Sequence, residues 1–376
     1  MKPIGSIQST AAAIGLLLCW STAFATETVL VDGVPHVKSG ASPSQGRTDV
    51  HLKELWRAGG EDGDILLGAP GAVLTDADGN IYIMDSQLCE VTVFAPDGGH
   101  LRTLGGEGDG PGEIRRLGSI FFMEDGQLAM AQTYPGRIIT LNLDGTPGRS
   151  FHFKTADMAE SNFGVIIGGR ERGGSFFLTG FTMHMTGPQN TQTYYLSQCD
   201  DQGLEKHRHF SKDYTINYAD FVADEIGIDF VWSRWDLGPD GFLYAAPHRN
   251  RYEIQVLDEA GKLLRVITRE YTSYKRSADE KEQARLFVEA YNRNHPTPPR
   301  QCNVEDLEAD ITGLRVEDSG EIWVSTSRSF RDLPEGVALL FDVFDSKGEF
   351  VRQTAVHGDF DPTRDLVQFL KGGAAW

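Results

Sequence analysis

The feature that most constrains the fold is a pair of glycine turns that recurs along the chain. The clearest copy, Ala72–Leu104, contains four short apolar segments, and two of its reversals are Asp76–Gly79 and Ala95–Gly98. The first glycines of the five copies are Gly79, Gly126, Gly174, Gly241 and Gly320, and the second are Gly98, Gly145, Gly203, Gly261 and Gly348. The first two copies lie 47 residues apart, which is typical of the about 40–50 residues of a four-stranded propeller blade. A ring of such sheets buries faces that a single sheet leaves exposed, so the repeat predicts an all-β propeller.

A sixth copy is expected to be divided between the two ends of the chain. Leu52–Trp56 and the glycine-rich residues after it match Leu101–Leu104 and its following residues at an offset of 46. We therefore expect Leu52–Trp56 to be the outer strand of a sixth blade and Leu366–Leu370 to be its inner strand, with Thr28–Asp32 adding another strand. Joining the termini in one blade would close the ring and remove exposed strand edges. The prediction is a single six-bladed domain over residues 26–376.

Three phrases resemble the NHL-like six-bladed β-propellers of secreted bacterial proteins. They are GNIYIMD at Gly79–Asp85, VFAPDG at Val93–Gly98 and LGGEGDGPGE at Leu104–Glu113. The resemblance spans nearly all of the chain after residue 25 and is sharpest in the first two copies. It implies the propeller fold. Because propellers of this kind include binding scaffolds, lyases and lactonases, it does not select an activity.

The first 25 residues have the pattern of a secretory signal peptide. Lys2 precedes the apolar run Ala11–Trp20, and Ala23–Ala25 forms an A-x-A cleavage site. Cleavage after Ala25 would place the protein in the periplasm or outside the cell. The alternative is a buried first helix, which the short apolar run and its flanks disfavour.

The charge of the chain excludes one class of partner. The sequence has 35 basic and 54 acidic residues, a formal net charge of −19. A strongly acidic protein repels phosphate backbones, so no nucleic-acid partner is expected. Beyond the leader no apolar stretch approaches the about 20 residues of a membrane-spanning helix, so no integral membrane segment is expected.

The cysteines do not indicate a disulfide framework. Removal of the leader leaves Cys89, Cys199 and Cys302, an odd number that leaves at least one thiol unpaired within the chain. Cys199 is expected at the end of a third strand and is predicted to be a free thiol. If any pair forms, we expect it between Cys89 and Cys302.

The differences in length between copies predict which face binds a ligand. In a blade, both short glycine turns lie on one face, while the loop between the second and third strands and the crossover to the next blade lie on the other, here called the loop-rich face. The longest connections are the loops Thr179–Gln192 and Thr326–Gly336 and the crossovers Ser211–Phe230 and Tyr271–Asp310. All of them fall on the loop-rich face, where a rigid scaffold usually carries its binding residues.

The crossover Tyr271–Asp310 is expected to contain a helix. Ser277–Glu280 reads as a capping box, Phe287, Ala290 and Tyr291 follow at helical spacing, and His295–Pro299 ends the element. Such a helix would be a lid or pocket wall over the mouth of the ring, or it would only plug that face.

The candidate ligand-binding residues are the polar and aromatic side chains predicted to surround the mouth of the ring on the loop-rich face. They are Tyr134, His184, His248, Arg249, Arg251 and Arg328. In an acidic protein the arginines are local positive points that suit an anionic group, although ion pairing with nearby acids is the simpler interpretation. The predicted function is therefore binding of a protein, peptide or glycan.

The alternative is a metal-assisted lyase or hydrolase at the mouth of the central channel. His184, His248, His295 and His357 all map to the loop-rich face, and three of them meeting at one point would form an open metal site. Their spacing in the sequence does not demand this. The glycine-rich phrase Gly105–Glu113 lacks the pattern of a phosphate loop, and no catalytic motif is recognisable. No catalytic residue and no cofactor are assigned.

Overall fold

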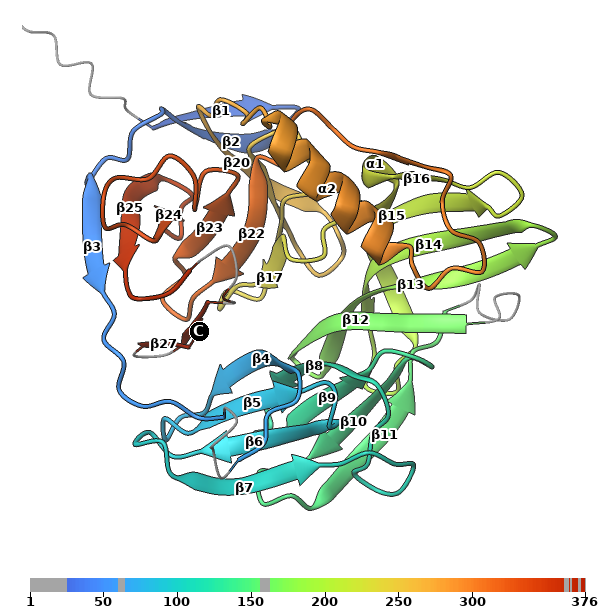
Figure 1. Cartoon of the computed structure of the whole chain (residues 1–376). Coiled ribbons are helices and arrows are strands. Elements are labelled where there is room, and N and C mark those ends of the chain that lie inside the picture. The colour runs from blue at the N-terminus through green and yellow to red at the C-terminus, as the bar shows by residue number, and fades with distance from the viewer. Residues whose placement is uncertain are drawn as a thin grey trace, which may run out of the picture.

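The chain folds as a five-bladed β-propeller. The computed structural model describes residues 26–59, 65–155, 163–361, 365, 367–370 and 373–375. In these residues five mainly antiparallel sheets follow one another around a common centre, with two helices beside them (Figure 1). The prediction of an all-β propeller is therefore confirmed, and the prediction of six blades is wrong. The predicted signal peptide, residues 1–25, lies outside the described residues.

Blades one to three each contain four strands, ordered from the centre outward as in the sequence. Blade one contains β4 (Pro70–Thr75), β5 (Ile81–Asp85), β6 (Glu90–Phe94) and β7 (His100–Gly105). Blade two contains β8 (Leu117–Phe122), β9 (Leu128–Gln132), β10 (Arg137–Leu141) and β11 (Pro147–His152). Blade three contains β12 (Phe163–Arg172), β13 (Ser175–Thr186), β14 (Gln189–Cys199) and β15 (Glu205–Asn217).

Blades four and five are extended on their outer edges by strands from the N-terminus. Blade four contains β17 (Trp235–Leu237), β18 (Leu243–Ala245), β19 (Glu253–Leu257) and β20 (Leu263–Arg269), and blade five contains β22 (Ile311–Val316), β23 (Ile322–Thr326), β24 (Leu339–Phe344) and β25 (Phe350–His357). The N-terminal strands are β1 (Glu27–Val31), β2 (Val34–Ser39) and β3 (Arg47–His51). β2 pairs in parallel with β20, and β3 pairs in parallel with β25. The strand expected near Thr28–Asp32 is thus present, in blade four.

The remaining elements belong to the crossovers and to the C-terminus. They are β16 (Val222–Asp224), α1 (Glu225–Ile228), α2 (Ala278–Tyr291), β21 (Gln301–Asn303), β26 (Gln368–Leu370) and β27 (Gly373–Ala375). α2 begins at the expected capping box, in which Ser277 and Glu280 exchange hydrogen bonds. Its buried residue is Val288, whereas Phe287 is 64% exposed. No helix in the described part of the chain is long and apolar enough to cross a membrane.

The sixth blade is missing because both of its expected strands have other contacts. Trp56 lies against the second turn of blade one, where its indole N–H donates to the Pro96 carbonyl at 3.1 Å and its ring packs on Phe94. At the C-terminus β26 pairs with β27 instead of with Leu52–Trp56, and the Gln368 side chain bonds to the backbone of β4. Leu366 lies outside the described residues.

Consecutive blades are joined by hydrophobic cores. Four clusters of buried side chains lie between blades one and two, two and three, three and four, and four and five. Alternation along the strands produces them. In β10, for example, Ile138 faces the core with blade three and Ile139 faces the core with blade one.

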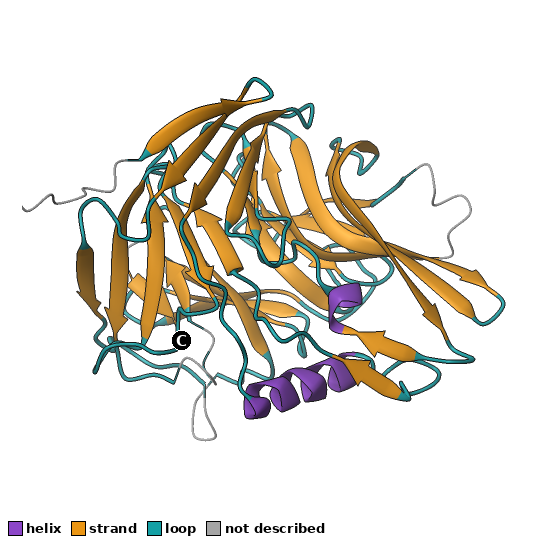
Figure 2. Ribbon diagram, turned by 90° about the horizontal axis from the view of Figure 1, so that it is seen from above, coloured by secondary structure: helices purple, strands orange, loops and turns teal. Residues whose placement is uncertain are grey.

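The loop-rich face carries both helices, as predicted from the lengths of the connections. Figure 2 shows α1 and α2 at the same end of the strands. The expected loop Thr179–Gln192, however, is a hairpin, because β13 and β14 continue to Thr186 and Gln189. Only its tip, from His184 to Gln189, is exposed, whereas Thr182, Asn190 and Gln192 are buried.

The described cysteines are unpaired. Cys89, Cys199 and Cys302 are all free thiols. The prediction for Cys199 is confirmed, and the suggested pair between Cys89 and Cys302 does not form. Burial raises the pKa of the Cys199 thiol far above its ordinary value, so this thiol is inert at neutral pH.

Candidate functional site

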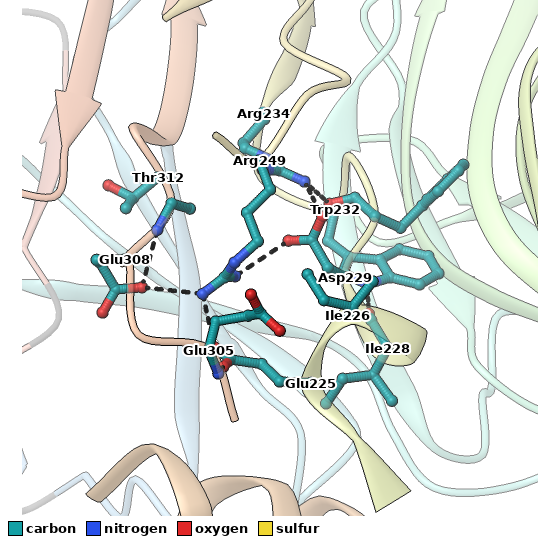
Figure 3. Close-up of polar contacts among 12 residues, drawn as sticks. Glu225, Ile226, Ile228, Asp229, Trp232, Arg234, Arg249, Glu305, Glu308 and Thr312 are labelled. Atoms are coloured by element: carbon teal, nitrogen blue, oxygen red, sulfur yellow. Dashed lines mark hydrogen bonds and ion pairs between the residues drawn. The ribbon is translucent and has the colours of Figure 1, made fainter. Parts of the chain in front are cut away.

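Arg249, one of the predicted ligand-binding residues, lies in a buried cluster of charges (Figure 3). Its guanidinium is 2.7 Å from Glu225, 3.5 Å from Asp229 and 3.7 Å from Glu308, and its side chain is only 10% exposed. Arg276 bonds to the same two glutamates at 2.8 Å. The cluster joins blade four to the crossover that carries α2, so Arg249 is engaged in holding the face together.

The other two predicted arginines are also close to acids. Arg251 is 66% exposed and lies 3.8 Å from Glu253. Arg328 lies 3.5 Å from Asp332, and its guanidinium is stacked over the ring of Tyr274. These contacts are exposed and weak, and the structure does not bring the two arginines together with Arg249 around one pocket.

The four histidines considered as metal ligands lie in separate local contacts. His184 is exposed on the β13 hairpin, and His248 lies 3.5 Å from Glu253. His295 is bonded to Tyr218 at 3.0 Å, and His357 to Asp49 at 2.8 Å. Among the described residues no group of three or more His, Cys, Asp or Glu side chains is arranged to hold a metal ion.

Tyr134, in contrast, lines a pocket of about 340 Å³ on the loop-rich face of blade two. The pocket is lined by Asp109, Arg115, Arg116, Gln132, Tyr134, Pro135, Arg137 and His152. Three adjacent strands place part of this set in one row, because Gln132 is opposite Arg137 and Arg137 is opposite His152. The pocket therefore follows the ends of the strands, from the start of the innermost strand outward.

Arg116 is held over Tyr134 by an unusual backbone conformation. It immediately precedes β8, and its φ of 55° lies in the left-handed region that non-glycine residues rarely adopt. The carbonyl of Arg116 accepts a hydrogen bond from the Thr133 N–H at 3.0 Å, which ties it to the loop before Tyr134. The guanidinium carbon lies 5.3 Å from the centre of the Tyr134 ring, within the range of a cation–π contact.

Gln132 organises the floor of the pocket. Its side-chain oxygen accepts from the Arg115 backbone N–H at 3.1 Å and from Arg137 at 3.2 Å, and its amide donates to the Pro135 carbonyl at 2.9 Å. Gln132 is only 4% exposed. One buried amide thus fixes the crossover, the Tyr134–Pro135 loop and the Arg137 side chain relative to one another.

The pocket is positively charged in an acidic protein. Three arginines line it against one acid, Asp109, which is paired with Arg115 at 2.9 Å. The hydrogen bond from Arg115 lowers the pKa of the Asp109 carboxyl. No described acidic side chain forms a direct ion pair with Arg116 or Arg137, although Asp109 also attracts Arg137 at longer range. The three arginines therefore outweigh the one acid, and the pocket keeps a net positive charge.

Reasoning from the sequence found Tyr134 and missed the arginines around it. Arg115 and Arg116 closely follow the glycine-rich phrase Gly105–Glu113, which belongs to the crossover between β7 and β8. The available signal was a pair of adjacent arginines at the start of an innermost strand. Arg137 gave none, because its proximity depends on the register of β9 and β10.

Comparisons with known proteins add only general similarity. No protein-family model and no curated protein matches the sequence, so membership of the NHL family is not shown. Among solved structures the chain is similar to β-propeller proteins, including a putative exported protein from Bacteroides fragilis (12% identity, 82% of this chain and 80% of that chain, TM-score 0.43). A member of the duf4221 family from Bacteroides vulgatus has 11% identity over 78% of this chain and 82% of that chain, with a TM-score of 0.43. Virginiamycin B lyase from Staphylococcus aureus has 13% identity over 79% of this chain and 71% of that chain, with a TM-score of 0.37. At these values the similarities carry no argument about function.

Proposed function

We propose that the protein is an extracytoplasmic propeller scaffold that binds a protein, peptide or glycan ligand through its loop-rich face. The pocket at the rim of blade two carries this proposal. Its volume of about 340 Å³ falls at the lower end of the about 300–1,000 Å³ of ligand sites. Its polar groups converge from two loops and three strand ends, which is how a scaffold positions a site.

A binding role accounts for the residues of the pocket better than a structural role does. Arg116 occupies a strained backbone conformation and stacks on an aromatic ring without an acidic partner among the described residues. Such a residue contributes little to the stability of blade two, whereas it supplies donors and charge to a ligand. The leader expected at residues 1–25 supports a periplasmic or secreted location.

The test is to find a ligand and then locate where it binds. The purified protein, residues 26–376, is applied to glycan and peptide arrays, and the strongest binder is titrated by calorimetry. We expect Tyr134→Ala to weaken binding at least tenfold, because an anchoring aromatic side chain is worth more than about 1.4 kcal/mol.

The control is Lys347→Ala, an exposed residue in a glycine turn on the opposite face. It is expected to change the affinity less than twofold, and both variants should keep the thermal midpoint of the parent. A ligand whose binding depends on Lys347 and not on Tyr134 would refute the proposal, as would the absence of any binder on both arrays.

A further inference from the structure

We infer that the pocket in blade two binds an oxyanion, a carboxylate or a sulfate, carried by a sugar ring. This inference rests on the proposed function and specifies its ligand. It is drawn from the charge of the pocket, the orientation of its donors, and its size and apolar wall.

The charge of the pocket selects an anion. Arg115 is balanced by Asp109, but Arg116 and Arg137 have no ion-pair partner in the described residues. With three arginines against one acid, the pocket is locally positive, whereas the chain as a whole has a net charge of −19 and repels anions. An anionic group therefore gains most by binding here.

The donors of the pocket are already oriented. Arg137 is held by Gln132 at 3.2 Å and by the Glu113 carbonyl at 3.3 Å, both through Nη2. Its other donors form no hydrogen bond to the described residues. Arg116 is fixed by the stacking on Tyr134. Planar guanidinium groups whose positions are fixed bind the oxygens of a carboxylate or sulfate with little further loss of entropy.

The size and walls of the pocket indicate a ring instead of a bare ion. Its volume of about 340 Å³ lies within the about 300–1,000 Å³ of small-molecule sites, which is larger than an inorganic anion needs. Tyr134 and Pro135 give it an apolar wall next to the cationic one. A pyranose ring has an apolar C–H face that packs on an aromatic side chain, whereas the acidic side chain of a peptide has no ring to fill this space.

The experiment uses four oligomeric probes with the protein of residues 26–376. They are a galacturonic acid trisaccharide, a sulfated galactose trisaccharide, the neutral galactose trisaccharide and a hexaglutamate peptide. We expect at least one acidic trisaccharide to bind at least tenfold more tightly than the neutral one. Comparing the affinities of the galacturonic acid and sulfated trisaccharides then shows whether the pocket prefers a carboxylate or a sulfate. Arg116→Ala should weaken that binding at least tenfold, since hydrogen bonds to charged groups are worth about 1.5–3 kcal/mol.

The matched control is Arg300→Ala, which removes the same charge from an exposed site in the crossover Tyr271–Asp310 on the loop-rich face and is expected to change the affinity less than twofold. Equal binding of neutral and acidic trisaccharides overturns the inference, and so does acidic binding that Arg116→Ala leaves unchanged. Tighter binding of the peptide overturns the sugar assignment. If no probe binds while an array ligand still requires Tyr134, the inference fails and the proposed function stands.

Discussion

Single side chains on the loop-rich face divide into those that hold it and those that are available to a ligand. Arg249 and Arg251 are two positions apart in one loop, yet the first is 10% exposed and the second 66% exposed. From the sequence the two are equivalent, and both are candidate ligand-binding residues. Their difference depends on Glu225 and Glu308, which reach Arg249 from distant crossovers.

Arg249→Ala is therefore expected to destabilise the fold. Removing Arg249 leaves Asp229 paired with Arg234, and leaves Glu225 and Glu308 paired with Arg276. The lost hydrogen bonds to charged groups cost about 2 kcal/mol. Arg251→Ala should stay within about 0.5 kcal/mol of the parent, as exposed substitutions usually do. Urea unfolding of the two variants measures both effects. Equal midpoints would show that the Arg249 cluster contributes nothing to stability.

Acid pH is expected to loosen the start of α2 through Glu280. Burial raises the pKa of this carboxyl, but hydrogen bonds from the Ser277 backbone N–H and from Arg331 outweigh burial and lower the pKa from 4.5 to about 2. A lowered pKa gives stability that is complete above about pH 4.5 and is lost as the pH falls toward 2. Glu280→Gln should remove part of the pH dependence of the unfolding free energy in this window. An unchanged pH profile would contradict this assignment.

At the scale of elements, the sequence predicted those features that depend on contacts between residues close together in the chain. The capping box located the start of α2 because Ser277 and Glu280 interact within one turn. The face of α2 that packs was not predicted, because Val288 is buried by residues far away in the sequence. The hairpin of β13 and β14 was read as a loop because polar residues, Thr182, Asn190 and Gln192, occupy buried strand positions where apolar residues would have indicated strands.

Trp56, which was expected in a strand of a sixth blade, packs instead on the second glycine turn of blade one. A Cβ added at Gly98, whose φ is 88°, would lie 2.7 Å from the Trp56 ring. Gly126 has a nearly equal φ of 83° but open space around it. Both substitutions to Ala incur the cost of a positive φ, about 1 kcal/mol.

We expect Gly98→Ala to be more destabilising than Gly126→Ala by at least 1 kcal/mol, the usual cost of forcing extra volume into a packed contact. Thermal unfolding of both variants, alone and combined with Trp56→Ala, provides the measurement. The difference should disappear when Trp56 is absent. If it persists, Trp56 does not pack on this turn.

At the scale of the whole molecule, the number of blades was the part that the sequence predicted wrongly. Five copies of the glycine turns are evident, and five blades form. The sixth was inferred from a repeat of the outer-strand motif near Trp56, whose position depends on where β1 to β3 find partners. Those strands form hydrogen bonds with the outer edges of blades four and five, which are far away in the sequence, so a local motif does not predict the pairing.

The ring has one junction unlike the others, between blades five and one. Each of the four other junctions has a hydrophobic core, and the described residues form no such cluster between blade five and blade one. At this junction the C-terminal Gln368 donates to the Gly71 carbonyl and accepts from the Val73 N–H, both on β4. The innermost strand of blade one thus depends on the C-terminus for part of its hydrogen bonding.

Deleting Asp365–Trp376 should therefore weaken one junction and leave the other four intact. Loss of Gln368 leaves Gly71 and Val73 without these partners, which costs about 1–3 kcal/mol for each group that stays buried. Hydrogen exchange should become faster in β4 and remain slow in β9 and β14, because locally opened regions exchange independently of cores that persist. The substitution Gln368→Ala should produce the same pattern to a smaller extent. Uniformly faster exchange in all five blades would mean that the ring unfolds as one unit, and unchanged exchange in β4 would mean that the C-terminus does not support it.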